Sequence, residues 1–180
     1  MGGGQAVRLA RKGAGGDRVT PAGLGGIFVI GLVIRLAVVA AGPDFMPSKD
    51  AAAYQLIAEN VLSGRGFSSD APGDTLWRPK SWRTPGYPLY IAAHYRVAGR
   101  RAPSAVYVSQ ALLDAATALL LVFIGGRLFE PRVALLAGFL YAIHPLPSLQ
   151  VATLGTEALA AFCLSLWVFH ENTLFKLNHV

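Results

Sequence analysis

The chain has 180 residues, of which 53% are hydrophobic and only 14% are charged, and its formal net charge is +6. Soluble domains carry about 25% charged residues, so this composition argues against a soluble domain and favours an integral membrane protein. The positive charge does not indicate nucleic-acid binding, because no run of interleaved basic and aromatic residues supports it. The single cysteine, Cys163, excludes an internal disulfide and offers no zinc-binding pattern.

The first predicted element is a membrane span over residues 22–41, an apolar run interrupted only by Arg35. A spanning helix needs about 20 such residues. Residues 1–21 form a basic tail before it, and positively charged flanks stay in the cytoplasm, so we expect a cytoplasmic N-terminus. A cleaved signal peptide is the rival interpretation, although signal sequences have shorter apolar regions and rarely contain arginine.

A long outer loop is predicted next, over residues 42–103. Within it, apolar residues between positions 50 and 62 recur at close to helical spacing and predict a short amphipathic helix in the membrane interface. Ser48 is the expected N-cap, and a glycine-rich stop at 63–66 ends the helix. Asp50 and Tyr54 are four residues apart and share one face. Asp50 can alternatively serve the helix N-terminus, and Tyr54 can be an interfacial anchor.

The second half of this loop, residues 77–90, combines tryptophans and tyrosines with basic residues and prolines. Aromatic side chains suit the headgroup layer of a membrane. Arginine can bind phosphate oxygens through two parallel hydrogen bonds, and proline stiffens the backbone around it. The segment therefore predicts a phosphate site around Arg83, with simple headgroup anchoring as the alternative.

Three further apolar runs follow, at 104–126, 133–143 and 156–169. We expect Gly125-Gly126 to break the first of them, and Arg127 and Arg132 to mark a cytoplasmic turn.

The run at 133–143 is too short to span alone, so it either tilts or continues through the following prolines toward Leu154. The predicted units are a second span at 104–126, a third span with an outer turn at 131–155, a fourth span at 156–172 and a tail at 173–180. The predicted fold class is an all-α integral membrane protein with about four transmembrane helices and interfacial helices in its first outer loop.

Charged residues inside the apolar runs need partners, because a charge in hydrocarbon is costly. Arg35 can pair with Asp114, or it can reach a lipid phosphate. Glu157 stands at the mouth of the fourth span, where it can stabilise a helix N-terminus or contact a ligand.

Taken in order, several of these segments resemble the first outer loop of the GT-C membrane glycosyltransferases. Within these enzymes, the segments resemble the protein O-mannosyltransferases and aminoarabinose transferases (glycosyltransferase family 39 and its bacterial relatives). The resemblance covers most of the chain. It rests on Asp50 with Tyr54, on Gly64-Arg65-Gly66-Phe67, on Arg83-Thr84-Pro85-Gly86-Tyr87-Pro88-Leu89, and on His144-Pro145 followed by Thr156-Glu157.

The resemblance implies roles for individual residues. Asp50 matches the loop aspartate that acts as a base or orients the acceptor. Tyr54, Arg83 and Tyr87 match residues that bind the lipid-linked substrate, with Arg83 near the leaving phosphate. Glu157 matches a second outer carboxylate that contacts substrate. A divalent cation, Mg²⁺ or Mn²⁺, held between Asp50 and Glu157 is a further expectation.

The implied function is transfer of a sugar from a polyprenyl-phosphate-linked donor to an acceptor on the outer face of the membrane. The expected location is the bacterial inner membrane, with membrane lipids as surroundings. Members of this family are usually longer, so we expect the chain to be the N-terminal portion of a larger enzyme, and on its own to be inactive. A non-catalytic lipid-binding or assembly protein is the main alternative, and another enzyme of lipid-linked glycans is a third.

Overall fold

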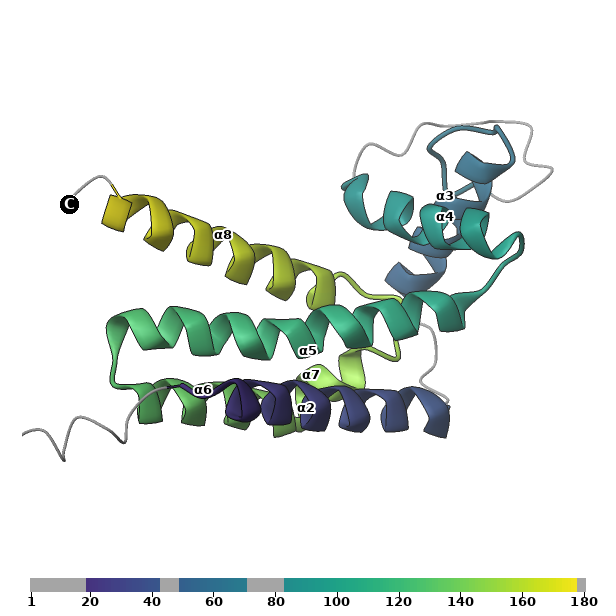
Figure 1. Ribbon diagram of the computed structural model, residues 1–180. Coiled ribbons are helices and arrows are strands. Elements are labelled where there is room, and N and C mark those ends of the chain that lie inside the picture. Colours follow the sequence, from purple (N-terminus) through teal and green to yellow (C-terminus); the bar gives the residue numbers. More distant parts are fainter. Residues whose placement is uncertain (1–18, 43–48, 71–82, 178–180) are drawn as a thin grey trace, which may run out of the picture.

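A computed structural model describes residues 19–42, 49–70 and 83–177. These ranges fold into helices without any strand, which confirms the all-α class (Figure 1). The helices are α2 (Pro21–Ala41), α3 (Lys49–Leu62), α4 (Gly86–Ala98), α5 (Pro103–Leu128), α6 (Pro131–Ile143), α7 (Pro145–Gln150) and α8 (Glu157–Leu177).

Helix α5 is the central element of the fold. It packs against α2 and α6 on one side and against α8 on the other. Helices α3 and α4 pair with each other beside the first turns of α5 (Figure 1). We call this end of the bundle the loop end, and the opposite end, where residues 129–130 join α5 to α6, the turn end.

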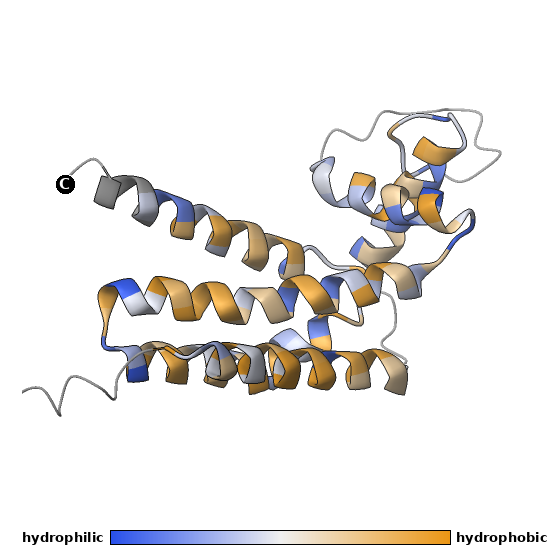
Figure 2. Ribbon diagram, viewed as in Figure 1, coloured by the Kyte–Doolittle hydropathy of each residue, from blue (hydrophilic) through white to orange (hydrophobic). Residues whose placement is uncertain are grey.

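Two helices in the described ranges are long and apolar enough to cross a membrane: α2, with 21 residues, and α5, with 26. At 1.5 Å per residue both exceed the roughly 30 Å of a bilayer core. Figure 2 shows apolar residues along the middle of the bundle and polar residues concentrated toward its ends. Helix α6, with 13 residues, is apolar but short, so the total of four spans stays a prediction.

Local sequence sets the ends of α2. The Thr20 side chain accepts a hydrogen bond from the Gly23 N–H (3.2 Å), and Pro21 occupies the first helical position, where its missing N–H costs nothing. Gly42 ends the helix with φ of 57°, in the left-handed region that glycine adopts most easily. The predicted span at 22–41 is therefore one uninterrupted helix.

The expected break of α5 at Gly125-Gly126 is wrong, because the helix runs on to Leu128. Gly125 lies against α6, and a Cβ added to it would stand 3.2 Å from Ala134 Cα. On α6, a Cβ on Gly138 would collide with Val122 and stand 2.8 Å from the Ala118 carbonyl oxygen. These glycines let two apolar helices approach closely, which is how helices associate in lipid.

The third apolar run ends where the prolines begin. Helix α6 stops at Ile143, and a separate six-residue helix, α7, starts at Pro145. His144 joins the two, and its ring accepts a hydrogen bond from the Leu146 N–H (3.2 Å). The run therefore does not continue toward Leu154 as one helix.

Helices α3 and α4 form a small unit at the loop end, and they share a hydrophobic core with Val106 of α5 and with Leu154. The predicted helix after position 50 is present, and Gly64, with φ of 76°, follows its last turn. Buried Asn60 donates to the Ser68 carbonyl (2.7 Å) and accepts from Arg65 (2.8 Å), which fixes the chain after the helix. Ser48, the expected N-cap, lies outside the described residues.

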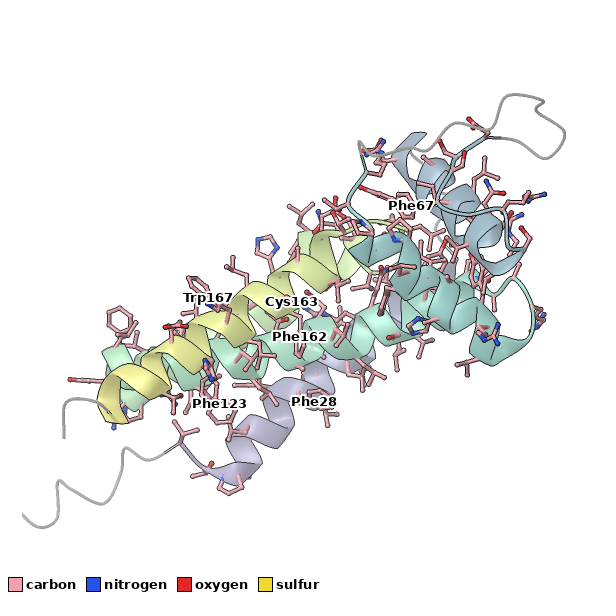
Figure 3. All side chains as sticks on the ribbon, turned by 90° about the horizontal axis from the view of Figure 1, so that it is seen from above. Phe28, Phe67, Phe123, Phe162, Cys163 and Trp167 are labelled. Atoms are coloured by element: carbon pink, nitrogen blue, oxygen red, sulfur yellow. The ribbon has the colours of Figure 1, made fainter. Side chains whose placement is uncertain are left out.

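Helix α8 covers the fourth apolar run, and its outer side carries exposed apolar residues. Trp167 is 60% exposed and Leu164 is 61% exposed. Figure 3 labels Trp167 and Cys163 on this helix. Lipid would cover such a surface in a membrane-embedded chain.

Candidate functional site

Asp50 and Arg83 meet at the loop end as an ion pair between Arg83 Nη2 and Asp50 Oδ1. Asp50 stands in the first turn of α3, and Arg83 lies shortly before α4. The guanidinium is largely covered, with 15% of the Arg83 side chain exposed, whereas the Asp50 side chain is 58% exposed. The pair therefore presents a carboxylate to the outside with a cation behind it.

Tyr54 completes this pair. It lies one turn after Asp50 on α3, and Arg83 Nη1 donates to its hydroxyl at 3.5 Å. The Arg83 guanidinium carbon also stands 5.0 Å from the centre of the Tyr54 ring, a cation–π contact. The four-residue spacing thus brings Asp50 and Tyr54 to one guanidinium, as their shared face predicts.

The ion pair sets the charge states of both partners. The hydrogen bond from Arg83 holds the pKa of the Asp50 carboxyl below its ordinary value of 3.8. The same hydrogen bond raises the pKa of the Arg83 guanidinium. Asp50 is therefore an ionised carboxylate at neutral pH, and Arg83 is a full cation.

Tyr87 is buried, whereas its predicted role in substrate binding suggests an exposed side chain. It is 3% exposed, and its ring packs edge-on against Tyr54 with the centroids 5.2 Å apart. Its hydroxyl donates to Gln110 Oε1 (2.5 Å) on α5. Burial raises the Tyr87 pKa well above its ordinary value, so the phenol stays protonated. In this arrangement Tyr87 supports Tyr54 from behind, and substrate binding by Tyr87 stays a prediction.

Gln110 is a residue that the sequence reasoning missed. It is fully buried in α5, and its amide donates to the carbonyls of Val151 and Thr153, at 2.9 Å each. It therefore links Tyr87 to the segment that leads into α8. An amide within an apolar run was the available signal, because a polar group there needs partners just as a charge does.

Glu157 lies in the first turn of α8 and is exposed. Its carboxylate folds back over Gly155, where a Cβ would collide with it. Its charge contributes to the raised pKa of Tyr87, after burial and the neighbouring Tyr90. Within the described residues, no hydrogen bond or ion pair joins Glu157 to Asp50.

A metal site is not assembled from the described residues, which contain no group of three His, Cys, Asp or Glu side chains able to hold an ion. The Asp50 carboxylate is engaged by Arg83, so a cation between Asp50 and Glu157 would have to compete with the guanidinium. The Mg²⁺ or Mn²⁺ expectation stays a prediction.

The second Arg–Asp pair lies in the middle of the bundle and confirms the predicted pairing. Arg35 on α2 donates to Asp114 on α5, and their side chains are 0% and 2% exposed. Tyr141 on α6 donates to the other Asp114 oxygen (2.6 Å). Three helices are joined by this one network.

Arg35 also satisfies a backbone carbonyl at the C-terminal end of α6. Its Nη1 donates to the Ala142 carbonyl at 2.8 Å and to the Gly31 carbonyl at 2.9 Å. A continuing helix would satisfy the Ala142 carbonyl with the Leu146 N–H, which donates to the His144 ring instead. The guanidinium therefore replaces hydrogen bonds that the proline-containing segment cannot supply.

These features define a helical protein of the membrane type with an open acid–arginine–phenol site at one end of its bundle. The chain belongs to the dolichyl-phosphate-mannose-protein mannosyltransferase family, whose sequence model matches residues 82–176, more than half of the chain. No curated protein and no solved structure is a significant match.

The family match points to glycosyltransferase activity in general, and the family implies a polyprenyl-phosphate-linked sugar as the general class of donor. Together with the two apolar helices of spanning length, it indicates membrane association. The matched segment contains Arg83, Tyr87 and Glu157, but it begins after Asp50 and Tyr54. The two α3 residues therefore enter the site through the geometry alone.

Proposed function

We propose that the chain, as part of a longer enzyme, transfers a sugar from a polyprenyl-phosphate donor to an acceptor at the outer face of the bacterial inner membrane. The observation that carries this proposal is the meeting of Asp50 and Arg83 at the loop end, with the carboxylate open to its surroundings. Family membership supports the reaction class.

The pair offers the two groups that the reaction needs. As the acceptor oxygen or nitrogen attacks the anomeric carbon, its proton passes to a carboxylate, the role that we assign to Asp50. The bond between the anomeric carbon and the phosphate oxygen breaks at the same time, and its electron pair leaves with the polyprenyl phosphate. The Arg83 guanidinium stabilises that negative charge, since a positioned cation acts most strongly where charge develops.

The resting ion pair suggests an order of events. While Arg83 holds Asp50, the low pKa of the carboxyl makes Asp50 a weak base. A donor phosphate that binds Arg83 competes with the carboxylate for the same N–H groups. Donor binding would then free Asp50 and raise its basicity when the acceptor is to be deprotonated.

A transfer assay tests this function. The full-length gene product, in detergent or in vesicles, is supplied with a polyprenyl-phosphate-linked sugar and candidate acceptors. We expect Asp50→Asn to lower the transfer rate by about 10²–10⁴-fold, the usual contribution of a positioned base. Glu130→Gln is the matched control, because Glu130 is exposed at the turn end and its side chain forms no cap hydrogen bond. Equal rates for Asp50→Asn and wild type would remove Asp50 from the reaction.

The membrane face is tested separately by cysteine labelling. In a Cys163→Ala background, Ala52→Cys places a thiol at an exposed position of α3, and Glu130→Cys places one at the turn end. A membrane-impermeant maleimide added to intact cells with a permeable outer layer should label position 52 and spare position 130. Labelling of position 130 alone would reverse the orientation and defeat an outer-face reaction.

A further inference from the structure

A groove lined by several arginines lies at the other end of the α3–α4 unit. It encloses about 410 Å³ between the last turns of α3 and α4 and the connection into α5. Glu59 on its wall stands nine residues after Asp50, about 14 Å along the helix axis, so the groove is separate from the Asp50–Arg83 pair. Its lining residues are Glu59, Leu62, Ser63, Tyr95, Arg96, Gly99, Arg100 and Arg101.

The groove carries more positive than negative charge. Arg101 pairs with Glu59 at 3.2 Å and is 63% exposed. Arg96 and Arg100 are exposed, and neither has an ion pair within the described part of the chain. Two guanidinium groups on one groove are therefore available to an anion. Arginine binds phosphate through paired N–H donors.

A buried phenol lines the same groove. Tyr95 is 2% exposed, and its hydroxyl makes no hydrogen bond of standard geometry to the described residues. Burial raises the pKa of Tyr95 to about 12, although nearby Arg101 acts in the opposite direction. The hydroxyl thus remains a neutral donor at physiological pH. A buried hydroxyl proton without an acceptor is unfavourable, and an anion in the groove would supply that acceptor.

The groove stands where a membrane surface would be. Arg101 precedes Pro103, the first residue of the candidate span α5, by two positions. Val97, one residue after Arg96, is 91% exposed. Basic residues beside a span are usually cytoplasmic. In the proposed orientation the loop end faces outward, so its three arginines are unfavourable there. A bound anion would offset this electrostatic cost.

We propose that this groove binds the phosphate of an anionic phospholipid headgroup and holds the α3–α4 unit against the membrane surface. Arg96 and Arg100 contact the phosphate oxygens, Tyr95 donates its hydroxyl, and Val97 lies among the adjoining lipid. The proposal depends on α5 spanning the membrane and is independent of sugar transfer.

Lipid titration of the full chain in detergent tests the proposal. Short-chain phosphatidylglycerol is added, and bound lipid and melting temperature are measured, with phosphatidylcholine as the zwitterionic comparison. We expect the Arg96→Gln/Arg100→Gln variant to lose about 30-fold in affinity for phosphatidylglycerol, since each basic residue at an anionic surface contributes roughly fivefold. Tyr95→Phe should lose about three- to tenfold, the contribution of one hydrogen bond.

The control pair is Arg8→Gln/Arg11→Gln, which removes the same charge from the N-terminal tail and should leave affinity unchanged. An equal loss of affinity in both double variants would show that net charge alone causes the effect, and it would overturn the proposed binding site. Inorganic phosphate and pyrophosphate form a third arm. Arginine-dependent stabilisation by pyrophosphate, with none by phosphatidylglycerol, would overturn the lipid assignment. Phosphatidylglycerol binding does not require transfer, so failure here leaves the proposed function to its own assay.

Discussion

The two Arg–Asp pairs of this chain have the same chemistry in opposite surroundings. Arg35 and Asp114 are buried between helices, whereas Asp50 is 58% exposed beside Arg83 at the loop end. The buried pair is saturated, because Tyr141 and the Gly31 and Ala142 carbonyls take up further hydrogen-bonding groups. The open pair leaves its carboxylate available to another molecule.

Burial decides what each pair can do. The attraction within a buried ion pair barely offsets the cost of desolvating both charges. Removing one partner leaves an unpaired buried charge, so the pair strongly favours the packing that keeps both partners together. An exposed pair contributes little to stability and exchanges partners readily. We therefore assign the Arg35–Asp114 pair to the scaffold and the Asp50–Arg83 pair to the reaction.

The largest expected effect concerns the buried pair. Asp114→Leu should lower the free energy of unfolding by about 3–5 kcal/mol, because Arg35 is left as a buried unpaired cation. The double variant Arg35→Met/Asp114→Leu should recover most of that loss. Denaturation of the detergent-solubilised chain measures both. A double variant as unstable as the sum of its singles would show that the pair is not a coupled unit.

Gln110, which links Tyr87 behind the open pair to the segment before α8, gives the next effect. Gln110→Leu should cost roughly 2–3 kcal/mol, because it leaves the Tyr87 hydroxyl and the Val151 and Thr153 carbonyls without their partner. Tyr87→Phe removes only one of these hydrogen bonds and should cost about 1 kcal/mol. Unfolding experiments that ranked the two variants in the reverse order would contradict the bridging role of Gln110.

Helix contact within the scaffold gives a smaller effect. Gly138→Ala should destabilise the chain by about 1–2 kcal/mol, because the added Cβ meets Val122 and the backbone of Ala118. Gly126→Ala is the control, since its Cβ would have only Ala134 at 3.9 Å. That variant should be neutral or slightly stabilising, as alanine is the better helix former. A similar loss in both variants would show that the contacts with Val122 and Ala118 at Gly138 are not the cause.

The smallest effect on stability is expected at the open pair. Asp50→Asn should leave the melting temperature unchanged at neutral pH, because the carboxylate is exposed. Since the folded-state pKa of Asp50 is lowered, any stabilisation by this pair is present above the ordinary value of 3.8 and fades only as pH falls below it. A melting temperature that drops for wild type but not for Asp50→Asn between pH 8 and 5 would contradict this.

Local patterns in the sequence predicted several of the helices and part of the site, but they did not predict α4 or α7. Spacing alone placed Asp50 and Tyr54 on one face, and two charges in apolar runs predicted the Arg35–Asp114 pair. The first inference succeeds because helical periodicity depends only on residues close in sequence. The second succeeds because a buried charge needs a partner of opposite charge, and the apolar runs contain few such residues.

Contacts between distant segments could not be predicted in the same way. The glycine pair at 125–126 indicated a break, but close packing of α5 on α6 keeps the helix intact. The role of Gln110 depends on carbonyls about 40 residues away. The arginine groove forms only when the ends of α3 and α4 meet beside α5. Tertiary packing decides such features, and a single sequence does not display it.

The affinity for polyprenyl phosphate tests the central claim most directly, because substitutions of Asp50 and Arg83 are expected to change this affinity differently. Asp50→Asn should bind the lipid phosphate at least as tightly as wild type, since a competitor for Arg83 has been removed. Arg83→Gln should bind about ten- to a hundredfold more weakly, the contribution of a charge-assisted hydrogen bond. Weaker binding in both variants, to a similar extent, would contradict the assignment of this pair to donor binding and reaction.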